Sequence, residues 1–322
     1  WAGRLASLAA YLLLASWAVR TAASFRWSIA IAATIPLNLA LAASVSPDGF
    51  AIAAVLLAVA MWTRVEGGGD VALPALIVST GLLALAKPPY FLVLGLFVAS
   101  ALLERTAGRI RAACVAGAGL VVGLAATLIN SGDNYQPVTT TMLRSIDYNP
   151  DLQMDHLTGD VPGFLWATAD TWVTEYRVYV QAWFRQLGFW EADMASVVPW
   201  AFVVILAVSL LILDGDDMER LSGMRRTIIA LGVAGLVIAM YAASFVYFTD
   251  QPDYDHIGFQ MARYSVPIAV LVFIACSPRA LIWPARRLGR RFALVGVVGV
   301  PLVAVGASLV TWLWTGANTE LG

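Results

Sequence analysis

The chain has 322 residues, of which 60% are hydrophobic and only 13% are charged, and its mean hydropathy is +0.77. A soluble domain usually carries about 25% charged residues, so this composition excludes an ordinary soluble enzyme and indicates an integral membrane protein. The net charge of −1 averages two oppositely charged sets of loops, and nothing in the chain predicts a nucleic-acid partner. Both cysteines lie inside apolar stretches, so no disulfide framework is predicted.

A helix needs about 20 apolar residues to cross a bilayer. We predict ten spans, which in chain order are Ala2–Val19, Ser28–Ala43, Asp48–Thr63, Val71–Ala86, Pro89–Leu103, Ile110–Ile129, Val197–Leu213, Thr227–Phe248, Tyr264–Ile282 and Phe292–Trp314. The third and fourth are short, as expected of tilted or partly re-entrant helices.

The predicted fold is therefore all-α, a polytopic transmembrane helix bundle. Residues 1–129 form spans one to six, residues 130–196 a partly helical extracytoplasmic insertion, and residues 197–322 spans seven to ten. The chain begins at Trp1 without a charged leader segment, and we expect its true N-terminal part to be missing.

The basic residues fall on alternate connections between these spans. One set of short loops holds 14 of the 20 cations, namely Arg20, Arg26, Arg64, Arg105, Arg109, Arg111, Arg220, Arg225, Arg226, Arg279, Arg286, Arg287, Arg290 and Arg291. The other set holds 14 of the 21 acids. The positive-inside rule places the first set in the cytoplasm, which puts the long loop 130–196 outside.

The long external loop contains an aromatic pattern typical of a helix. Trp172, Tyr176, Tyr179 and Trp183 recur at steps of 4, 3 and 4, and Asp170 or Thr171 is positioned to cap the helix start. Such a helix suits a membrane interface. Its aromatic stripe either packs on the transmembrane bundle or forms a platform for a lipid-linked substrate, with Trp172 and Tyr176 as the candidate contacts.

Asp48 follows Pro47 at the predicted start of the third span. It either caps that helix, where the helix dipole favours an acid, or serves as an ionisable catalytic group at the bilayer edge. Lys87, the only lysine, lies in Ala86-Lys87-Pro88-Pro89-Tyr90 at the same predicted face. Its compact charge either holds a phosphate oxygen or extends from a helix end into the interface.

A third external segment precedes the ninth span. Asp253 and Asp255 flank Tyr254, before His256, and form a weak candidate site for a divalent cation, or else a solvated acidic loop. Arg263 is a stronger candidate, because a guanidinium can clamp a diphosphate with parallel hydrogen bonds. The alternative is a salt bridge from Arg263 to Asp48 or Asp255. On the predicted cytoplasmic side, Asp214, Asp216 and Asp217 lack the spacing and closing glutamate of a calcium loop.

Three elements resemble the DUF2142 family of bacterial membrane proteins. They are Ser44-Val45-Ser46-Pro47-Asp48, Lys87-Pro88-Pro89-Tyr90, and Ala262-Arg263-Tyr264 with Pro267. Ala262 stands where the family usually has glycine and Met261 where it has glutamine, although Gln260 is adjacent. The resemblance adds Tyr90, Gln260 and Tyr264 to the candidate substrate-binding residues.

That family is similar in layout to the GT-C glycosyltransferases, which use polyprenyl-phosphate sugars outside the cytoplasmic membrane. The resemblance thus implies an enzyme of the bacterial inner membrane, in which Asp48 orients the acceptor or serves as the base, unless the missing N-terminal part supplies the base. Its partners would be the bilayer, a polyprenyl-phosphate sugar donor, and a cell-envelope glycan or lipid acceptor. A transporter or flippase of lipid-linked saccharides, and a non-catalytic scaffold, remain alternatives.

Overall fold

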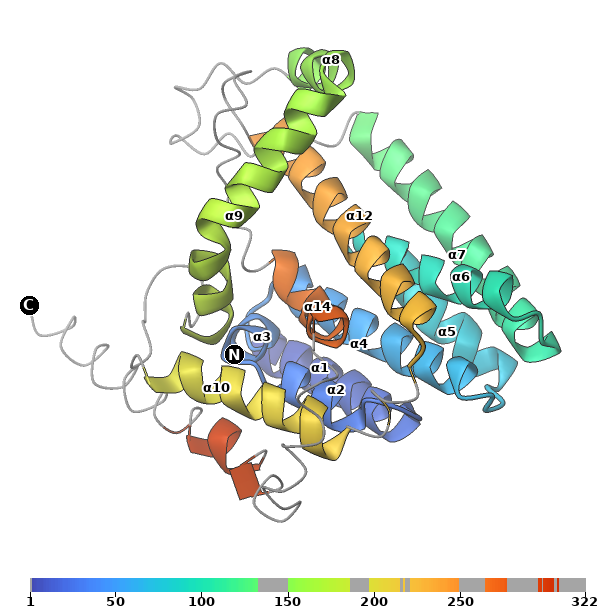
Figure 1. Ribbon diagram of the computed structural model, residues 1–322, viewed down its shortest axis with the longest axis vertical. Helices are drawn as coiled ribbons and strands as arrows, with labels where there is room; N and C mark the ends of the chain where they lie inside the picture. The colour runs from blue at the N-terminus through green and yellow to red at the C-terminus, as the bar shows by residue number, and fades with distance from the viewer. Residues whose placement is uncertain are drawn as a thin grey trace, which may run out of the picture.

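The computed structural model describes residues 2–132, 150–185, 197–214, 217, 221–248 and 264–276, with a few positions between 295 and 306. Every regular element in these ranges is a helix (Figure 1). In chain order they are α1 (Ala2–Thr21), α2 (Arg26–Ala33), α3 (Pro36–Ala42), α4 (Pro47–Glu66), α5 (Leu73–Ala84), η1 (Tyr90–Leu94), α6 (Gly95–Leu103), α7 (Ala107–Gly132), α8 (Pro150–Gly159), α9 (Val161–Arg185), α10 (Val197–Val208), the π-helix η2 (Ser209–Leu213), α12 (Gly223–Phe248), η3 (Val266–Ile268) and α14 (Ala269–Cys276). The predicted all-α class is confirmed.

Four of these helices are long and apolar enough to cross a bilayer: α1, α4, α7 over Ala107–Ile129, and α12 over Gly223–Val246. Other predicted spans correspond to shorter apolar helices, among them α5, the η1–α6 pair and η3–α14. The total of about ten spans therefore stays a prediction.

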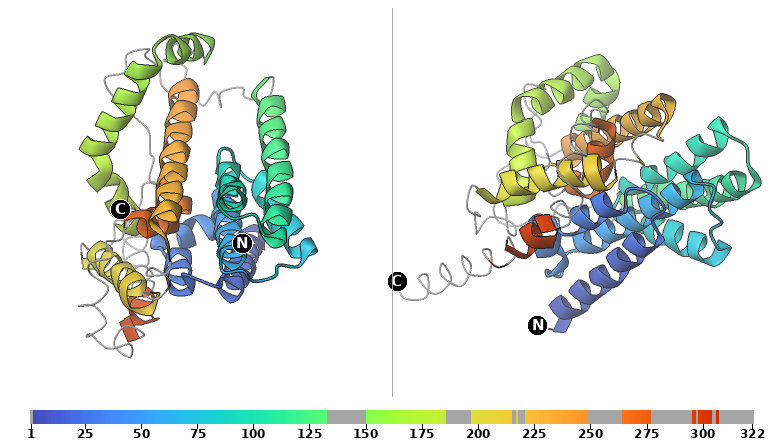
Figure 2. Two further views of the ribbon diagram at one scale, coloured as in Figure 1. Left: turned by 45° about the vertical axis from the view of Figure 1, so that its right-hand side comes forward. Right: turned by 60° about the horizontal axis from the view of Figure 1, so that its bottom comes forward.

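Helix α4 forms the centre of the bundle (Figures 1 and 2). From Ala51 to Met61 every residue is buried, and α1, α3, α5 and η3 all contact the helix. A helix that is apolar all round is stable only when neighbours cover it on every side. Its polar residues are accordingly near its ends, with Asp48 in the first turn and Glu66 at the last position.

The predicted span Ser28–Ala43 is interrupted. Pro36 cannot donate a backbone hydrogen bond, so α2 ends at Ala33 and α3 begins at Pro36 itself. The carbonyls at the break find other donors: Asn38 Nδ2 donates to Ala32 O at 2.7 Å and Tyr11 OH donates to Ala33 O at 2.6 Å. Buried backbone carbonyls without partners are costly in an apolar setting, and these two bonds make the break tolerable.

The start of α2 is capped by acids about 190 residues away in the sequence. Asp214 accepts hydrogen bonds from Ser28 N at 2.8 Å and Ser28 Oγ at 2.6 Å, while Asp217 Oδ2 accepts from Phe25 N at 2.9 Å. Both carboxylates lie at a helix N-terminus, where the dipole favours negative charge. Asp214 and Asp217 therefore have a structural role at the start of α2.

The aromatic pattern from Trp172 to Trp183 does fall on a helix, α9, but the predicted caps are wrong. The helix begins at Val161, nine residues before Asp170, and Asp160 caps it by accepting from Gly163 N at 3.0 Å. Asp170 and Thr171 lie inside the helix, because the apolar pattern that starts at Trp172 continues upstream through Phe164 and Ala167. Helix α9 contacts α3, α10 and α12 and runs along one edge of the molecule at a steep angle to α10 (Figure 1).

Asp214 gives the fold a defined pH dependence. Burial raises the pKa of Asp214 from 3.8 to about 6, against the opposing effect of the hydrogen bonds from Ser28 and Trp27. A carboxyl with a higher pKa in the folded chain stabilises the fold fully below pH ~4, and this contribution is lost as the pH rises to about 6.

We therefore expect the unfolding free energy of the wild type, relative to that of Asp214→Asn, to fall by on the order of 2 kcal/mol between pH 4 and 6. Denaturant titrations of both proteins in the same detergent at several pH values measure this difference. A difference that stays constant or rises over this interval contradicts the assignment.

Candidate functional site

The turn before α4 is built to present Asp48. Ser46 is the N-cap residue, with its Oγ accepting from Asp48 N at 3.2 Å and donating to Asp48 Oδ2 at 2.9 Å. Pro47 occupies the first helical position, where its missing N–H costs nothing. The predicted placement of Pro47 and Asp48 in the first turn is confirmed, but the cap itself is Ser46.

Gly49 allows α4 to begin directly against the end of α3. A Cβ atom at Gly49 would lie 2.7 Å from Ala42 Cα, a backbone atom that has no room to move aside. The close approach holds the Ser44–Asp48 turn against the bundle, and only 4% of the Asp48 side chain is exposed. A buried carboxylate needs a compensating charge or hydrogen bonds.

Lys87 supplies that charge from the turn between α5 and η1. Its Nζ lies 2.8 Å from Asp48 Oδ1, and its side chain is 25% exposed. Each Asp48 oxygen thus accepts one hydrogen bond, Oδ1 from Lys87 and Oδ2 from Ser46. Within the described residues, one oxygen of the carboxylate therefore holds the lysine and the other is held by the serine.

Tyr264 completes the enclosure of the lysine from a third segment. The Lys87 ammonium lies over the Tyr264 ring, 4.0 Å from its centroid, which is a close cation–π contact. Tyr264 is itself fixed, because the buried Tyr90 donates its hydroxyl proton to Tyr264 O at 2.8 Å. We call Asp48, Lys87, Tyr90 and Tyr264 the Lys87 site.

The Lys87 site can hold an anionic oxygen. An ammonium group has three protons, and within the described part of the chain Nζ donates to a single acceptor, Asp48 Oδ1. The side chain remains partly exposed, so an incoming oxygen can reach it. Asp48 and Tyr264 fix its position in advance, which reduces the ordering cost of binding.

The structure brings four of the predicted site residues together, and they come from three separate segments of the chain. Arg263 directly precedes Tyr264 in the sequence but lies outside the described residues, as do Gln260, Asp253 and Asp255. The proposed Arg263–Asp48 pair and the metal site therefore stay predictions, although Asp48 already has Lys87 as a partner. No group of three potential metal ligands occurs among the residues that the structure does describe.

Trp172 is half-buried against the hydrophobic core, as the bundle-packing alternative expects. The Tyr176 side chain lies outside the described part, so the substrate contacts of both residues remain predictions.

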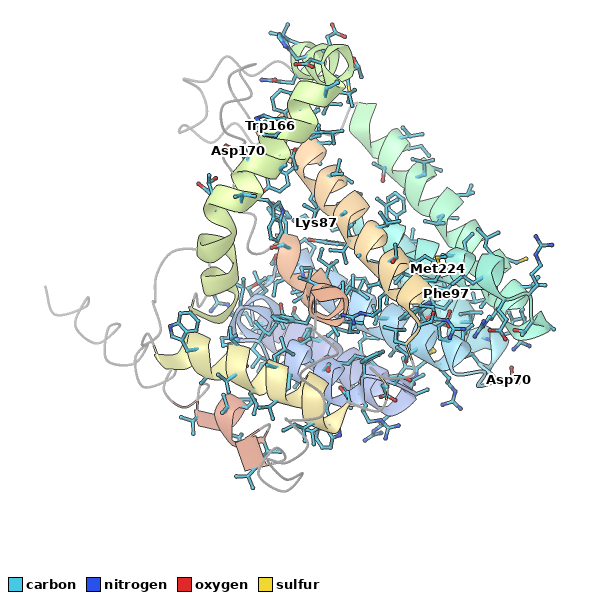
Figure 3. The ribbon with its side chains drawn as sticks, viewed as in Figure 1. Asp70, Lys87, Phe97, Trp166, Asp170 and Met224 are labelled. Atoms are coloured by element: carbon cyan, nitrogen blue, oxygen red, sulfur yellow. The ribbon has the colours of Figure 1, made fainter. Side chains whose placement is uncertain are left out.

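A second polar cluster, which the sequence did not predict, lies at the other end of α4. Arg109 and Arg225 both pair with Glu66 and Glu104, and Arg225 Nε lies 2.9 Å from Glu66 Oε2. Figure 3 shows Lys87 between α9 and α12, with Met224 and Asp70 towards the opposite end of the bundle. The arginine-rich loops thus contact one another well away from the Lys87 site.

Comparison with known proteins gives one finding. The family model described as "Predicted membrane protein (DUF2142)" matches residues 1–272. No curated protein and no solved structure matches the chain significantly.

The Asp48–Lys87 pair should be energetically coupled, because one partner is buried and the other is only partly exposed. In a double-mutant cycle of Asp48→Ala and Lys87→Met, we expect a coupling of about 1–3 kcal/mol in the unfolding free energy.

The exposed pair of Arg111 and Asp70 is the matched control, with side chains 43% and 86% exposed, and should couple by less than about 1 kcal/mol. Denaturation of all variants in one detergent provides the comparison. Equal coupling energies in the two pairs would show that the Asp48–Lys87 pair stabilises the fold no more than an exposed ion pair does.

Proposed function

The chain belongs to the DUF2142 family of predicted membrane proteins, and from this premise we propose that it is a GT-C-like glycosyltransferase. It transfers a sugar from a polyprenyl-phosphate donor to an envelope glycan or lipid acceptor, on the extracytoplasmic face of a bacterial inner membrane.

One observation carries this proposal: the only lysine of a strongly apolar chain is held in place by a buried aspartate and a tyrosine ring. A solvated helix-end lysine needs no such support. A lysine that binds a phosphate benefits from being held in place, because a fixed ammonium stabilises charge on phosphate oxygens without reorganising. A lipid-linked phosphate is the phosphate source that a membrane protein meets at the bilayer edge.

The proposed reaction is an inverting displacement at the anomeric carbon. The acceptor hydroxyl forms the new C–O bond, and the bond from the anomeric carbon to the phosphate oxygen breaks with its electron pair leaving on the phosphate. A carboxylate takes the hydroxyl proton. Lys87 stabilises the charge that develops on the departing polyprenyl phosphate, and Arg263, next to Tyr264 in the sequence, is the second candidate cation.

The contacts of Asp48 favour a positioning role over that of general base. Both its oxygens accept hydrogen bonds from side chains, and its burial leaves little room for an acceptor sugar. In this scheme Asp48 orients Lys87, and the base comes from another external segment. Asp253 and Asp255 are the nearest acids in sequence to Tyr264, and they also remain the candidates for binding a divalent cation.

A transporter is the second candidate function, and one observation favours it. The break between α2 and α3 contains the buried Asn38, whose Oδ1 has no hydrogen-bond partner in the described structure. Broken helices with free polar groups are typical of substrate sites in transporters. However, Tyr11 and Asn38 already occupy the carbonyls at this break, which favours a structural kink.

We expect Lys87→Met to lower the rate of sugar transfer by about 100-fold or more, because the charge on the leaving phosphate loses its fixed counter-charge. The assay follows the release of polyprenyl phosphate from a polyprenyl-phosphate sugar by membranes containing the full chain. Arg111→Met, at the opposite end of α4, should retain wild-type activity. Arg263→Ala should also be inactive, with Arg144→Ala as its matched control.

Equal activity in Lys87→Met and Arg111→Met would contradict the proposal. Movement of the lipid-linked sugar across liposome membranes without product would identify a flippase instead. A scaffold would keep its cellular role in both Asp48→Ala and Lys87→Ala.

A further inference from the structure

The part of α9 with described side chains has three distinct flanks. Phe164, Ala167, Thr168 and Thr171 are buried, and the Phe164 ring lies 6.1 Å from that of Phe245 on α12. This flank packs against the rest of the bundle. In the part of α9 whose side chains are described, most of the remaining surface is exposed.

The uncovered surface divides into an apolar and a polar strip. Successive residues advance by about 100° around a helix, which places Leu165, Ala169, Val173 and Trp166 side by side in that order. Continuing in the same direction, the next positions are Asp170 and Thr174, both exposed. Trp166 and Val173 are 75% and 73% exposed, which is far more than an apolar side chain in contact with protein would be.

We infer that α9 is seated along the membrane–water boundary, with the Leu165–Ala169–Val173–Trp166 strip in lipid and the Asp170–Thr174 strip in water. The partner of this surface is thus the outer part of the bilayer. This inference does not depend on the proposed enzymatic function.

Three observations favour lipid over a protein partner. First, the apolar strip ends at Trp166, directly beside Asp170 on the same uncovered surface (Figure 3), and tryptophan is the side chain that prefers the interface itself. Second, α9 packs against α10, whose first turns carry further exposed apolar residues, Trp200 and Val204. Third, α9 is steeply inclined to the long apolar helix α12 in Figure 1, as expected of a helix in the interface plane beside a membrane-spanning helix.

The test measures the surroundings of single nitroxide labels on the full chain in vesicles of phosphatidylcholine and phosphatidylglycerol. Both native cysteines are replaced by serine, and one cysteine is introduced at Leu165, Val173, Asp170 or Thr174. All four positions are exposed on α9, so each variant should fold. Collisions with oxygen report lipid, and collisions with a water-soluble nickel chelate report water.

We expect labels at Leu165 and Val173 to collide several-fold more with oxygen than with the nickel chelate, and labels at Asp170 and Thr174 to show the reverse. Nickel accessibility at all four positions would overturn the inference by placing the whole surface in water. Exclusion of both reagents from Leu165 and Val173 would overturn it as well, because protein would then cover the strip. Equal oxygen preference at all four positions would also overturn the inference, because the Asp170–Thr174 strip would then lie in lipid as well.

Discussion

The ion pair between Asp48 and Lys87 is the contact on which the arrangement of this end of the bundle depends. It joins the turn before α4 to the turn after α5, and the tyrosine ring over the same ammonium adds the segment before η3. Among the described residues, Lys87 alone gives the buried Asp48 carboxylate an opposite charge, and its loss would leave only the Ser46 hydroxyl as a side-chain partner. Such an unpaired charge is costly enough to force the turn to rearrange.

Helix α4 has an acidic residue at each end, and each of them forms ion pairs with basic residues of other segments. Asp48 pairs with Lys87, while Glu66 pairs with Arg109 and Arg225. The 20 residues between the two ends of the helix span about 30 Å, roughly the thickness of a hydrocarbon core. The buried apolar middle and the charged ends of α4 therefore match the layers of a bilayer. This match favours the Lys87 site and the arginine-rich cluster facing opposite sides of the membrane.

Sequence reasoning identified the members of the Lys87 site but not their contacts. Asp48, Lys87, Tyr90 and Tyr264 stand out locally, because charged residues and proline turns are rare in an apolar chain. The pairing of Asp48 with Lys87 depends on which segments meet, and spacing along the chain does not specify this. The same limit applies to Asp214, whose acidic run predicts neither its partner Ser28 nor its burial. The break at Pro36 was predictable from proline chemistry, but the apolar residues on both sides of it favoured one continuous span.

Sidedness is the most direct test of the whole account. Val45, three residues before Asp48, is 74% exposed, and the Asp70 side chain, four residues after Glu66, is 86% exposed. Single cysteines at these two positions, in a chain without the native cysteines, can be treated with a membrane-impermeant maleimide in sealed right-side-out vesicles. The account predicts that Val45→Cys is labelled at once and Asp70→Cys only after the vesicles are permeabilised. Labelling of both positions in sealed vesicles, or of Asp70→Cys alone, would contradict an external Lys87 site.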